Sequence, residues 1–388
     1  MRLPPMAIVF LLWGAGLGAA AQFGKVSVFY DTLGSRYGGY GEVALGLVVS
    51  IVGIVGLVFG TTAGLLVARI GPRRAIVAAL AAGAAMSALQ STLPGYPVMI
   101  ASRVVEGMSH LAIVVVGPTM IATLAPPARR PFAMTLWSSF FGVTYAFLAL
   151  TAPWFKLNGG AETLFLGHAA MMAALAGIVA LTLPPDPAEG LPPAGGMLAH
   201  HVEIYASPRL AAPAMGFCCY TFLYVAVLTL LPPQTPEAQR GLIATGMPLV
   251  SIAVSLILGV RLLRYWSAVR VVQAGYLAAI PGFLLLWMAW GSGPGMVVAA
   301  FTLSGALGIV QGASFAAIPE LNATPEARSK AAGAVAQLGN LGTTTGTPVL
   351  AALIAANGAP GLAGPAILLC LAGILLHHWQ SRRRSADS

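Results

Sequence analysis

Long apolar runs separated by short polar gaps fill almost the whole chain. A membrane-spanning helix needs about 20 consecutive apolar residues. Runs of this length occupy residues 6–29, 43–67, 74–93, 97–124, 131–155, 163–183, 208–231, 240–260, 267–289, 293–319, 328–356 and 360–380. The pattern therefore predicts an all-α membrane protein with twelve transmembrane helices joined by short connections.

One gap is much longer than the others. Residues 184–207 are rich in proline, glycine and polar residues, which is typical of a linker. This gap separates six predicted spans from six. The predicted organisation is an N-terminal six-helix bundle over residues 1–183, a cytoplasmic linker over 184–207, a C-terminal six-helix bundle over 208–380 and a cytoplasmic tail over 381–388.

The two halves also share a weak sequence echo. Gly64 and Arg69 end the second predicted span, and Gly259 and Arg264 end the eighth at the same offset of 195 residues. Matched six-helix halves are typical of transporters in which two bundles rock about a central binding site. The echo therefore favours a transporter built from two parallel repeats.

Composition and charge placement decide where the chain resides. Only 8% of the residues are charged and 58% are hydrophobic, whereas a soluble domain carries about 25% charged residues. The net charge of +9 would suggest nucleic acid in a soluble protein, but most of the basic residues lie in alternate gaps. This positive-inside bias predicts a multi-pass protein of the inner or plasma membrane with both termini in the cytoplasm and no nucleic-acid partner.

Three polar residues interrupt the fourth apolar run. Arg103, Glu106 and His110 are spaced three and four residues apart, so they share one face of a helix. A charge at this depth costs about 2.5 kcal/mol or more, and such residues usually mark an ion or substrate path. We expect Arg103 to bind an anion, and Glu106 and His110 to carry a proton. The alternative is a structural Arg103–Glu106 ion pair, with His110 hydrogen-bonded between helices.

Further polar residues at membrane depth are candidate substrate ligands. Gln22 and Lys25 share a face of the first run, where Lys25 either adds a second positive charge or extends to the outer surface. Gln311, Gln337 and Asn340 either contact substrate or bond across helices, for about 0.6 kcal/mol each. The histidine pairs of the chain lack companion ligands, so we expect no metal.

Residues 64–74, GLLVARIGPRR, resemble the loop between spans two and three of the major facilitator superfamily. The matching positions are Gly64, Leu66, Arg69, Gly71 and Arg73. Ala68 stands where that family has an acidic residue that helps to latch the cytoplasmic side. The resemblance implies that Gly64, Arg69, Gly71 and Arg73 form a conformational loop whose latch is weaker or different in this chain.

The fourth run strengthens this resemblance. Arg103, Glu106 and Gly107 are similar to the R-x-x-Q-G motif of the same family, with Glu in place of the usual Gln. In that family the arginine of this motif is associated with proton coupling. The resemblance implies a fold of two six-helix bundles. It also implies that Arg103 and Glu106 are functional residues.

Together these features predict a monomeric, proton-coupled secondary transporter that works by alternating access. We expect a small anionic or amphipathic organic solute, because the interior holds Arg103 and Lys25 against the single carboxylate of Glu106. Efflux of amphipathic drugs by proton antiport is an alternative, although the fifth run lacks the G-x-x-x-G-P pattern of many such exporters. A polytopic enzyme or scramblase is the rival class. No cluster of catalytic groups and no P-loop is present in the sequence, so we expect neither enzymatic activity nor a cofactor.

Overall fold

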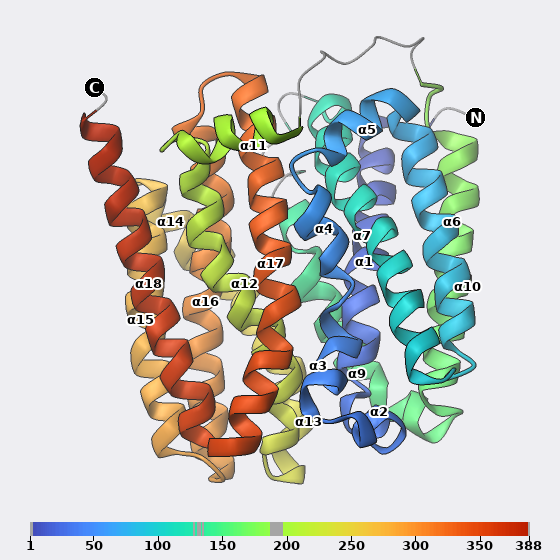
Figure 1. Cartoon of the computed structure of the whole chain (residues 1–388), viewed down its shortest axis with the longest axis vertical. Coiled ribbons are helices and arrows are strands. Elements are labelled where there is room, and N and C mark those ends of the chain that lie inside the picture. The colour runs from blue at the N-terminus through green and yellow to red at the C-terminus, as the bar shows by residue number, and fades with distance from the viewer. Residues whose placement is uncertain (1–2, 127–128, 130–132, 134–135, 187–196, 387–388) are drawn as a thin grey trace. The chain divides into compact units, whose positions relative to one another are not determined.

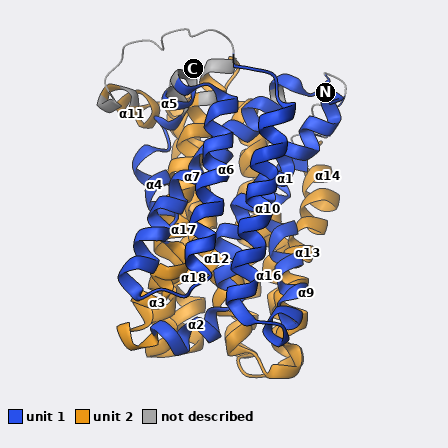
Figure 2. Cartoon of the chain, turned by 90° about the vertical axis from the view of Figure 1, so that its right-hand side faces the viewer, with its two compact units in different colours: residues 1–37, 51–195 blue, residues 38–50, 196–388 orange. Residues whose placement is uncertain are grey.

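The computed structural model describes residues 3–386 except 127–128, 130–132, 134–135 and 187–196. The described residues are helical almost throughout (Figure 1). The chain divides into two compact units, one of residues 1–37 and 51–195 and the other of residues 38–50 and 196–388 (Figure 2). Below they are called the first unit and the second unit.

The first unit contains eight described helices. They are α1 (Pro5–Ser27), α2 (Tyr30–Tyr37), α4 (Gly53–Phe59), α5 (Ala63–Ile70), α6 (Pro72–Gln90), α7 (Tyr96–Leu124), α9 (Phe140–Leu157) and α10 (Gly160–Thr182). Helix α1 packs against α7, α9 and α10, and α6 packs against α7 and α10. Buried apolar side chains of these helices, such as Leu12, Ile76, Ile113 and Met172, form the core.

The second unit contains the remaining described α-helices. They are α3 (Glu42–Ser50), α11 (Met197–Ala206), α12 (Ala211–Leu230), α13 (Glu237–Val254), α14 (Val260–Leu262), α15 (Ala268–Met288), α16 (Gly293–Leu321), α17 (Pro325–Asn357) and α18 (Ala359–Ala386). A π-helical segment, Ser255–Gly259, joins α13 to α14. Helices α12 and α17 run side by side, as do α15 and α16 (Figure 1).

Local sequence explains where several helices begin. Proline occupies the first turn of α1, α6, α7, α16 and α17, where its missing N–H is not needed. The Thr324 hydroxyl caps α17 by accepting a hydrogen bond from the Ala327 N–H at 3.1 Å. Gly71 separates α5 from α6 with φ +95°, a conformation that side chains beyond glycine rarely adopt.

The number of spans differs from the prediction. Helices lie in all twelve predicted ranges, but among the described residues nine helices are long and apolar enough to cross a membrane, or ten if α3 and α4 count as one span. Helices α6 and α17 are absent from this set, and α17 carries polar residues such as Gln337, Asn340 and Thr343. The structure therefore supports nine to ten spans by length and composition, and the count of twelve stays a prediction.

The second predicted span, 43–67, is broken rather than continuous. It forms α3, α4 and α5, with a bend of 66° between the first two. Gly53, Gly56 and Gly60 lie in this stretch, and glycine lowers the stability of a helix interior by about 1 kcal/mol. Helix α3 packs against α17, where the Ser50 hydroxyl donates to the Thr344 carbonyl at 2.8 Å. This contact explains why α3 belongs to the second unit.

Candidate functional site

Helix α7 carries the central residues of the predicted site. Arg103 and Glu106 are fully buried and His110 is 4% exposed. Their spacing directs them toward α1, which packs directly on α7. The close approach at this level needs Gly107, because a Cβ there would lie 2.3 Å from the Val52 carbonyl oxygen of the adjoining segment.

A three-member ion cluster forms where α1 meets α7. The Lys25 ammonium lies 2.7 Å from Glu106 Oε1, and the Arg103 guanidinium lies 2.5 Å from Glu106 Oε2. All three side chains are completely buried. Lys25 therefore does not extend to the outer surface; it shares the only carboxylate of this cluster with Arg103. Each buried charge therefore lies beside an opposite charge, and this pairing offsets the desolvation cost of burial.

Helices α6 and α10 add a neutral polar layer around these charges. Gln90 Nε2 donates to Glu106 Oε2 at 2.9 Å, and Lys25 Nζ donates to the Ser87 hydroxyl. His168 of α10 lies 2.5 Å from the Ser87 hydroxyl through Nδ1 and 3.0 Å from the Gly18 carbonyl through Nε2.

These contacts fix the direction of the hydrogen bonds. A carbonyl oxygen only accepts, so His168 Nε2 carries a proton and donates to Gly18. With the ammonium donating to Ser87, the Ser87 hydroxyl donates to the nearer of its two acceptors, His168 Nδ1 at 2.5 Å rather than Glu106 Oε1 at 3.5 Å, so His168 is a neutral imidazole. A directed chain thus runs from the Lys25 ammonium through Ser87 and His168 to the backbone of α1.

Gln22 and His110 lie beside this cluster and hold different partners. The Gln22 amide donates to the Ser109 hydroxyl at 2.8 Å, and its backbone carbonyl accepts from Arg103 at 2.5 Å. His110 Nδ1 lies 3.1 Å from the Ala19 carbonyl oxygen, and its ring meets Phe23 edge-on at 5.0 Å. His110 therefore bridges two helices, as the structural alternative describes, whereas Gln22 helps to position Arg103.

The predicted polar residues of the second unit do not form one cluster in the described contacts. Gln337 on α17 accepts from the Tyr205 hydroxyl at 2.6 Å and lies 2.9 Å from His201 Nε2, so α11 of the linker covers it. Asn340 donates to the Ala336 carbonyl of its own helix at 2.7 Å. Gln311 is half-buried on α16. Their role as substrate ligands stays a prediction.

Burial changes the pKa of one tyrosine in the predicted linker, Tyr205. Tyr205 lies outside the predicted spans, and burial raises its pKa to about 12. Its hydroxyl is therefore protonated at physiological pH and available to donate to Gln337. A second linker contact joins the Lys330 ammonium to Glu203 at 2.6 Å.

An acidic residue from elsewhere in the chain, Asp186, binds the segment that resembles the family motif. Asp186 accepts hydrogen bonds from the backbone N–H groups of Arg73 at 2.7 Å and Arg74 at 3.1 Å, at the N-terminus of α6. The Arg73 side chain donates to the Ala180 carbonyl. The side chain of Arg69 lies outside the described residues. An acid from beyond α10 thus binds the loop in which Ala68 replaces the usual acidic residue.

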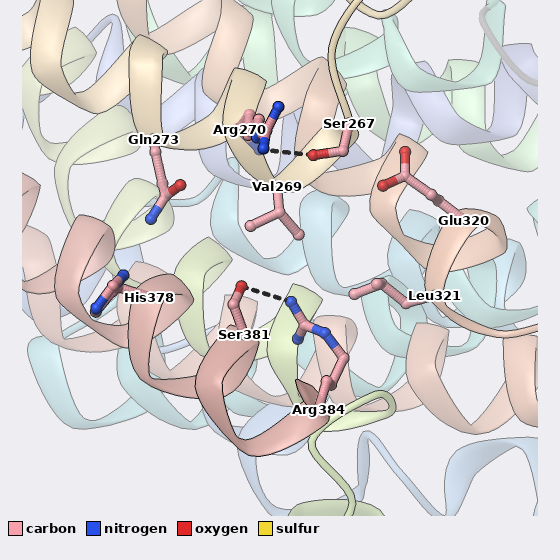
Figure 3. Close-up of a pocket in the computed structure, with 9 residues that line it drawn as sticks. All are labelled: Ser267, Val269, Arg270, Gln273, Glu320, Leu321, His378, Ser381 and Arg384. Carbon is pink, nitrogen blue, oxygen red and sulfur yellow. Dashed lines mark hydrogen bonds between the residues drawn. The ribbon is translucent and has the colours of Figure 1, made fainter. Parts of the chain in front are cut away.

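A separate cavity of about 370 Å³ lies in the second unit among the ends of α15, α16 and α18 (Figure 3). It is lined by Ser267, Val269, Arg270, Gln273, Glu320, Leu321, His378, Ser381 and Arg384. Glu320 accepts from the Ala268 N–H at 2.8 Å, and Arg384 donates to the Ser381 hydroxyl at 2.7 Å and the Pro208 carbonyl at 3.0 Å. None of the predicted site residues is among these lining residues, so the cavity is distinct from the ion cluster.

Sequence reasoning missed Ser87, Gln90 and His168. His168 had a usable signal, because a titratable residue interrupts the apolar run 163–183 as His110 interrupts the fourth run. Ser87 and Gln90 are three residues apart, which places them on one helix face, but small polar residues of this kind are common in membrane helices. Only their contacts with Lys25 and Glu106 distinguish them.

Comparison with known proteins identifies the family of the chain. The family model of the Major Facilitator Superfamily matches residues 8–347, and the chain belongs to that family. It is 26% identical over 232 residues to the inner membrane transport protein YajR of Escherichia coli (strain K12), a match that covers 58% of this chain and half of that relative's length. The chain is therefore a multi-pass membrane protein of a transporter family that is typically non-enzymatic.

Solved structures confirm the fold at low sequence identity. The crystal structure of the human organic anion transporter MFSD10 (TETRAN) aligns with a TM-score of 0.73 at 17% identity, covering 97% of this chain and all of that chain. A bacterial homologue of the human lysosomal transporter Spinster, in an inward-facing and occupied conformation, aligns with a TM-score of 0.75 at 12% identity, covering 98% of both chains. These likenesses establish the fold predicted from the sequence.

Proposed function

We propose that this secondary transporter moves a small organic anion and couples its transport to protons through Glu106. The observation that carries the proposal is the fully buried cluster of Lys25, Glu106 and Arg103. Two cations and one carboxylate leave one net positive charge, +2 − 1 = +1. A buried excess of positive charge is stabilised by an anion, which favours this class of solute.

Glu106 is the group through which a proton would act. Its carboxylate oxygens are held by Lys25 at 2.7 Å and by Arg103 at 2.5 Å. Protonation removes the negative charge and releases both cations to bind the carboxylate or other anionic group of a substrate. Binding of the proton and binding of the anion then strengthen each other by the same factor. This linkage couples movement of the anion to movement of a proton.

The surrounding residues supply supporting roles in this proposal. Arg103 and Lys25 bind the anion, and Gln22 positions Arg103 through its backbone carbonyl. His110, one helical turn from Glu106, is our second candidate for a proton carrier. The human organic anion transporter MFSD10 (TETRAN) shares the fold at 17% identity, and this likeness in fold supports the same substrate class.

The proposal is tested by anion binding at several pH values. The probe is 4-isopropylbenzoate, titrated into purified protein in lipid nanodiscs and followed by calorimetry between pH 5.5 and 8. For wild type we expect affinity to fall as pH rises, by up to about tenfold per pH unit for one linked proton. Glu106→Gln, which mimics the protonated state, should bind without this pH dependence, and Arg103→Gln should lose binding.

A matched lysine pair controls for general charge effects. Lys25→Gln should weaken binding, whereas Lys156→Gln, at an exposed position near the end of α9, should bind as wild type does. Glu106→Gln with the full pH dependence of wild type, or Arg103→Gln with undiminished affinity, would contradict the proposal. Uptake of the same anion into sealed proteoliposomes, driven by an imposed pH gradient, then measures coupling directly.

A further inference from the structure

The cavity of the second unit has a lining that favours an anion (Figure 3). All of its lining residues belong to the second unit. Two of them are arginines, Arg270 and Arg384, and Glu320 is the one carboxylate in the lining. Small-molecule sites typically have volumes of about 300–1,000 Å³, so this cavity of about 370 Å³ can hold a small ligand. The proposed transport makes no use of this cavity.

The charged groups of the lining differ in how far the fold already satisfies them. Glu320 accepts a hydrogen bond from the Ala268 N–H at 2.8 Å, at the start of α15. Arg384 donates to two neighbouring groups of the chain and interacts electrostatically with Glu320 and with a further arginine, Arg209. Arg270 differs from both, because its guanidinium makes no hydrogen bond or ion pair with any residue that the structure describes. Arg270 is therefore available to a ligand.

The charges of this region do not cancel. Three positive charges, of Arg209, Arg270 and Arg384, and the negative charge of Glu320 leave a net charge of +2. A guanidinium presents its N–H groups in a planar fork that matches the oxygen atoms of a phosphate. The hydroxyl group of Ser267 adds a neutral donor to the lining. This chemistry suits a phosphate group better than a cation.

Aromatic side chains place the cavity at the surface of the membrane. Tyr265 and Trp266 directly precede α15, and Trp379 follows the lining residue His378 on α18. All three aromatic side chains are exposed. Tyrosine and tryptophan are enriched where a bilayer meets water. The predicted spans 267–289 and 360–380 also end among these residues, so the cavity lies at the level of the lipid headgroups.

An exposed apolar surface continues from the cavity along the same two helices. Leu277 lies one turn beyond Gln273 on α15, and Leu375 lies one turn before His378 on α18. These leucines are 63% and 64% exposed, and α15 packs against α18. A ligand that carries both a phosphate and an acyl chain would use both surfaces, whereas a soluble phosphate compound would use only the cavity.

We propose that this cavity binds the phosphate headgroup of an anionic phospholipid, with Arg270 and Arg384 as its ligands. The acyl chains lie along the exposed leucines of α15 and α18. The placement of the basic residues predicts that this end of the chain is cytoplasmic, and the cytoplasmic leaflet of a membrane carries anionic lipids. The site is separate from the ion cluster of the first unit and does not depend on the proposed anion transport.

Three probes identify the occupant. Dioleoylphosphatidylglycerol has an anionic headgroup, dioleoylphosphatidylcholine has the same chains with a zwitterionic headgroup, and glycerophosphoglycerol is the anionic headgroup without chains. Native mass spectrometry of the full chain in detergent gives the dissociation constant of the first bound lipid. The proteins are wild type, Arg270→Gln, Arg270→Gln/Arg384→Gln and the control Arg264→Gln. Arg264 is exposed and lies outside the lining, so this control removes one positive charge without altering the cavity.

Wild type should bind phosphatidylglycerol at least about fivefold more tightly than phosphatidylcholine, the factor expected for one arginine beside an anionic lipid. Arg270→Gln should weaken phosphatidylglycerol binding by about fivefold and the double variant by about 25-fold, whereas Arg264→Gln should bind as wild type does. Without lipid, Arg270→Gln should melt at the temperature of wild type, because its side chain has no partner among the described residues. A hundredfold excess of glycerophosphoglycerol should not displace the lipid.

Several results would overturn the proposal. Equal affinity of wild type for the two lipids would show that the cavity does not select an anion. An equal loss in Arg264→Gln and Arg270→Gln would assign the preference to general surface charge. Displacement of the lipid by glycerophosphoglycerol would identify the occupant as a soluble phosphate compound. If the double variant melts lower than wild type, Arg270→Gln alone decides, since only Arg384 also makes hydrogen bonds within the fold.

Discussion

The buried Lys25–Glu106 pair allows a quantitative test of how the first unit is held together. Glu106→Gln leaves Lys25 and Arg103 fully buried without their counter-charge. Removing one partner of a buried ion pair costs about 3–5 kcal/mol. A domain of 150–250 residues loses roughly 2–4 °C of melting temperature per kcal/mol, so we expect a loss of about 6–20 °C.

The companion variants measure how much of this loss belongs to the pair. Lys25→Met leaves the Arg103–Glu106 pair intact, and the double variant Lys25→Met/Glu106→Gln removes both members of the Lys25–Glu106 contact. We expect the double variant to be less destabilised than the sum of the single variants, by about 1–3 kcal/mol. Reversible unfolding in mixed micelles, followed by tryptophan fluorescence, gives the three free energies of unfolding.

The chain contains a suitable control pair for this cycle. Lys330 and Glu203 lie 2.6 Å apart, close to the 2.7 Å between Lys25 and Glu106, but they are 20% and 52% exposed. An exposed ion pair is worth about 0–1 kcal/mol, so the same cycle there should give a small coupling. A coupling for Lys25 and Glu106 no larger than that of the exposed pair would refute the electrostatic account of the cluster.

Three further predictions follow from contacts elsewhere in the structure. Gly107→Ala should lower the melting temperature, because its Cβ would lie 2.3 Å from a backbone carbonyl oxygen, whereas the control Gly167→Ala, with nothing within 4 Å, should not. Asp186→Asn should destabilise by about 1 kcal/mol, since it weakens a charged cap on the first amides of α6; an unchanged free energy of unfolding would show that the cap contributes nothing. Burial raises the pKa of Tyr205 to about 12, above the value near 10 of an unfolded chain, so the stability from its neutral hydroxyl is complete below pH 10 and is lost as pH rises from about 10 to about 12. The absorbance at 295 nm of wild type minus Tyr205→Phe should titrate near pH 12; a midpoint near 10 would contradict the burial of this side chain.

Much of the architecture could be predicted from the sequence because the membrane imposes it. Every spanning segment must satisfy its backbone internally and present about 20 apolar residues, so hydropathy alone located the helices. The broken second span was not predicted. No charged residue interrupts 43–67, and the bend between α3 and α4 becomes visible only when α3 is seen packed against α17.

The site was predictable to the extent that it lies on one helix. Arg103, Glu106 and His110 share a face of α7 because of helical geometry, which sequence spacing reveals. Their partners do not follow from spacing. Lys25 is 81 residues from Glu106 and Ser87 is 81 residues from His168, so these contacts depend on which helices pack together.

The sequence by itself determined the class of protein, the positions of the helices and the presence of costly charges in the fourth run. These properties depend on local composition and on the apolar thickness of a bilayer. Tertiary structure decided that Lys25 and Arg103 share Glu106, and that His168 joins them through Ser87. Charge pairing and hydrogen bonding act over a few ångströms, and only folding brings residues so distant in the chain within that range.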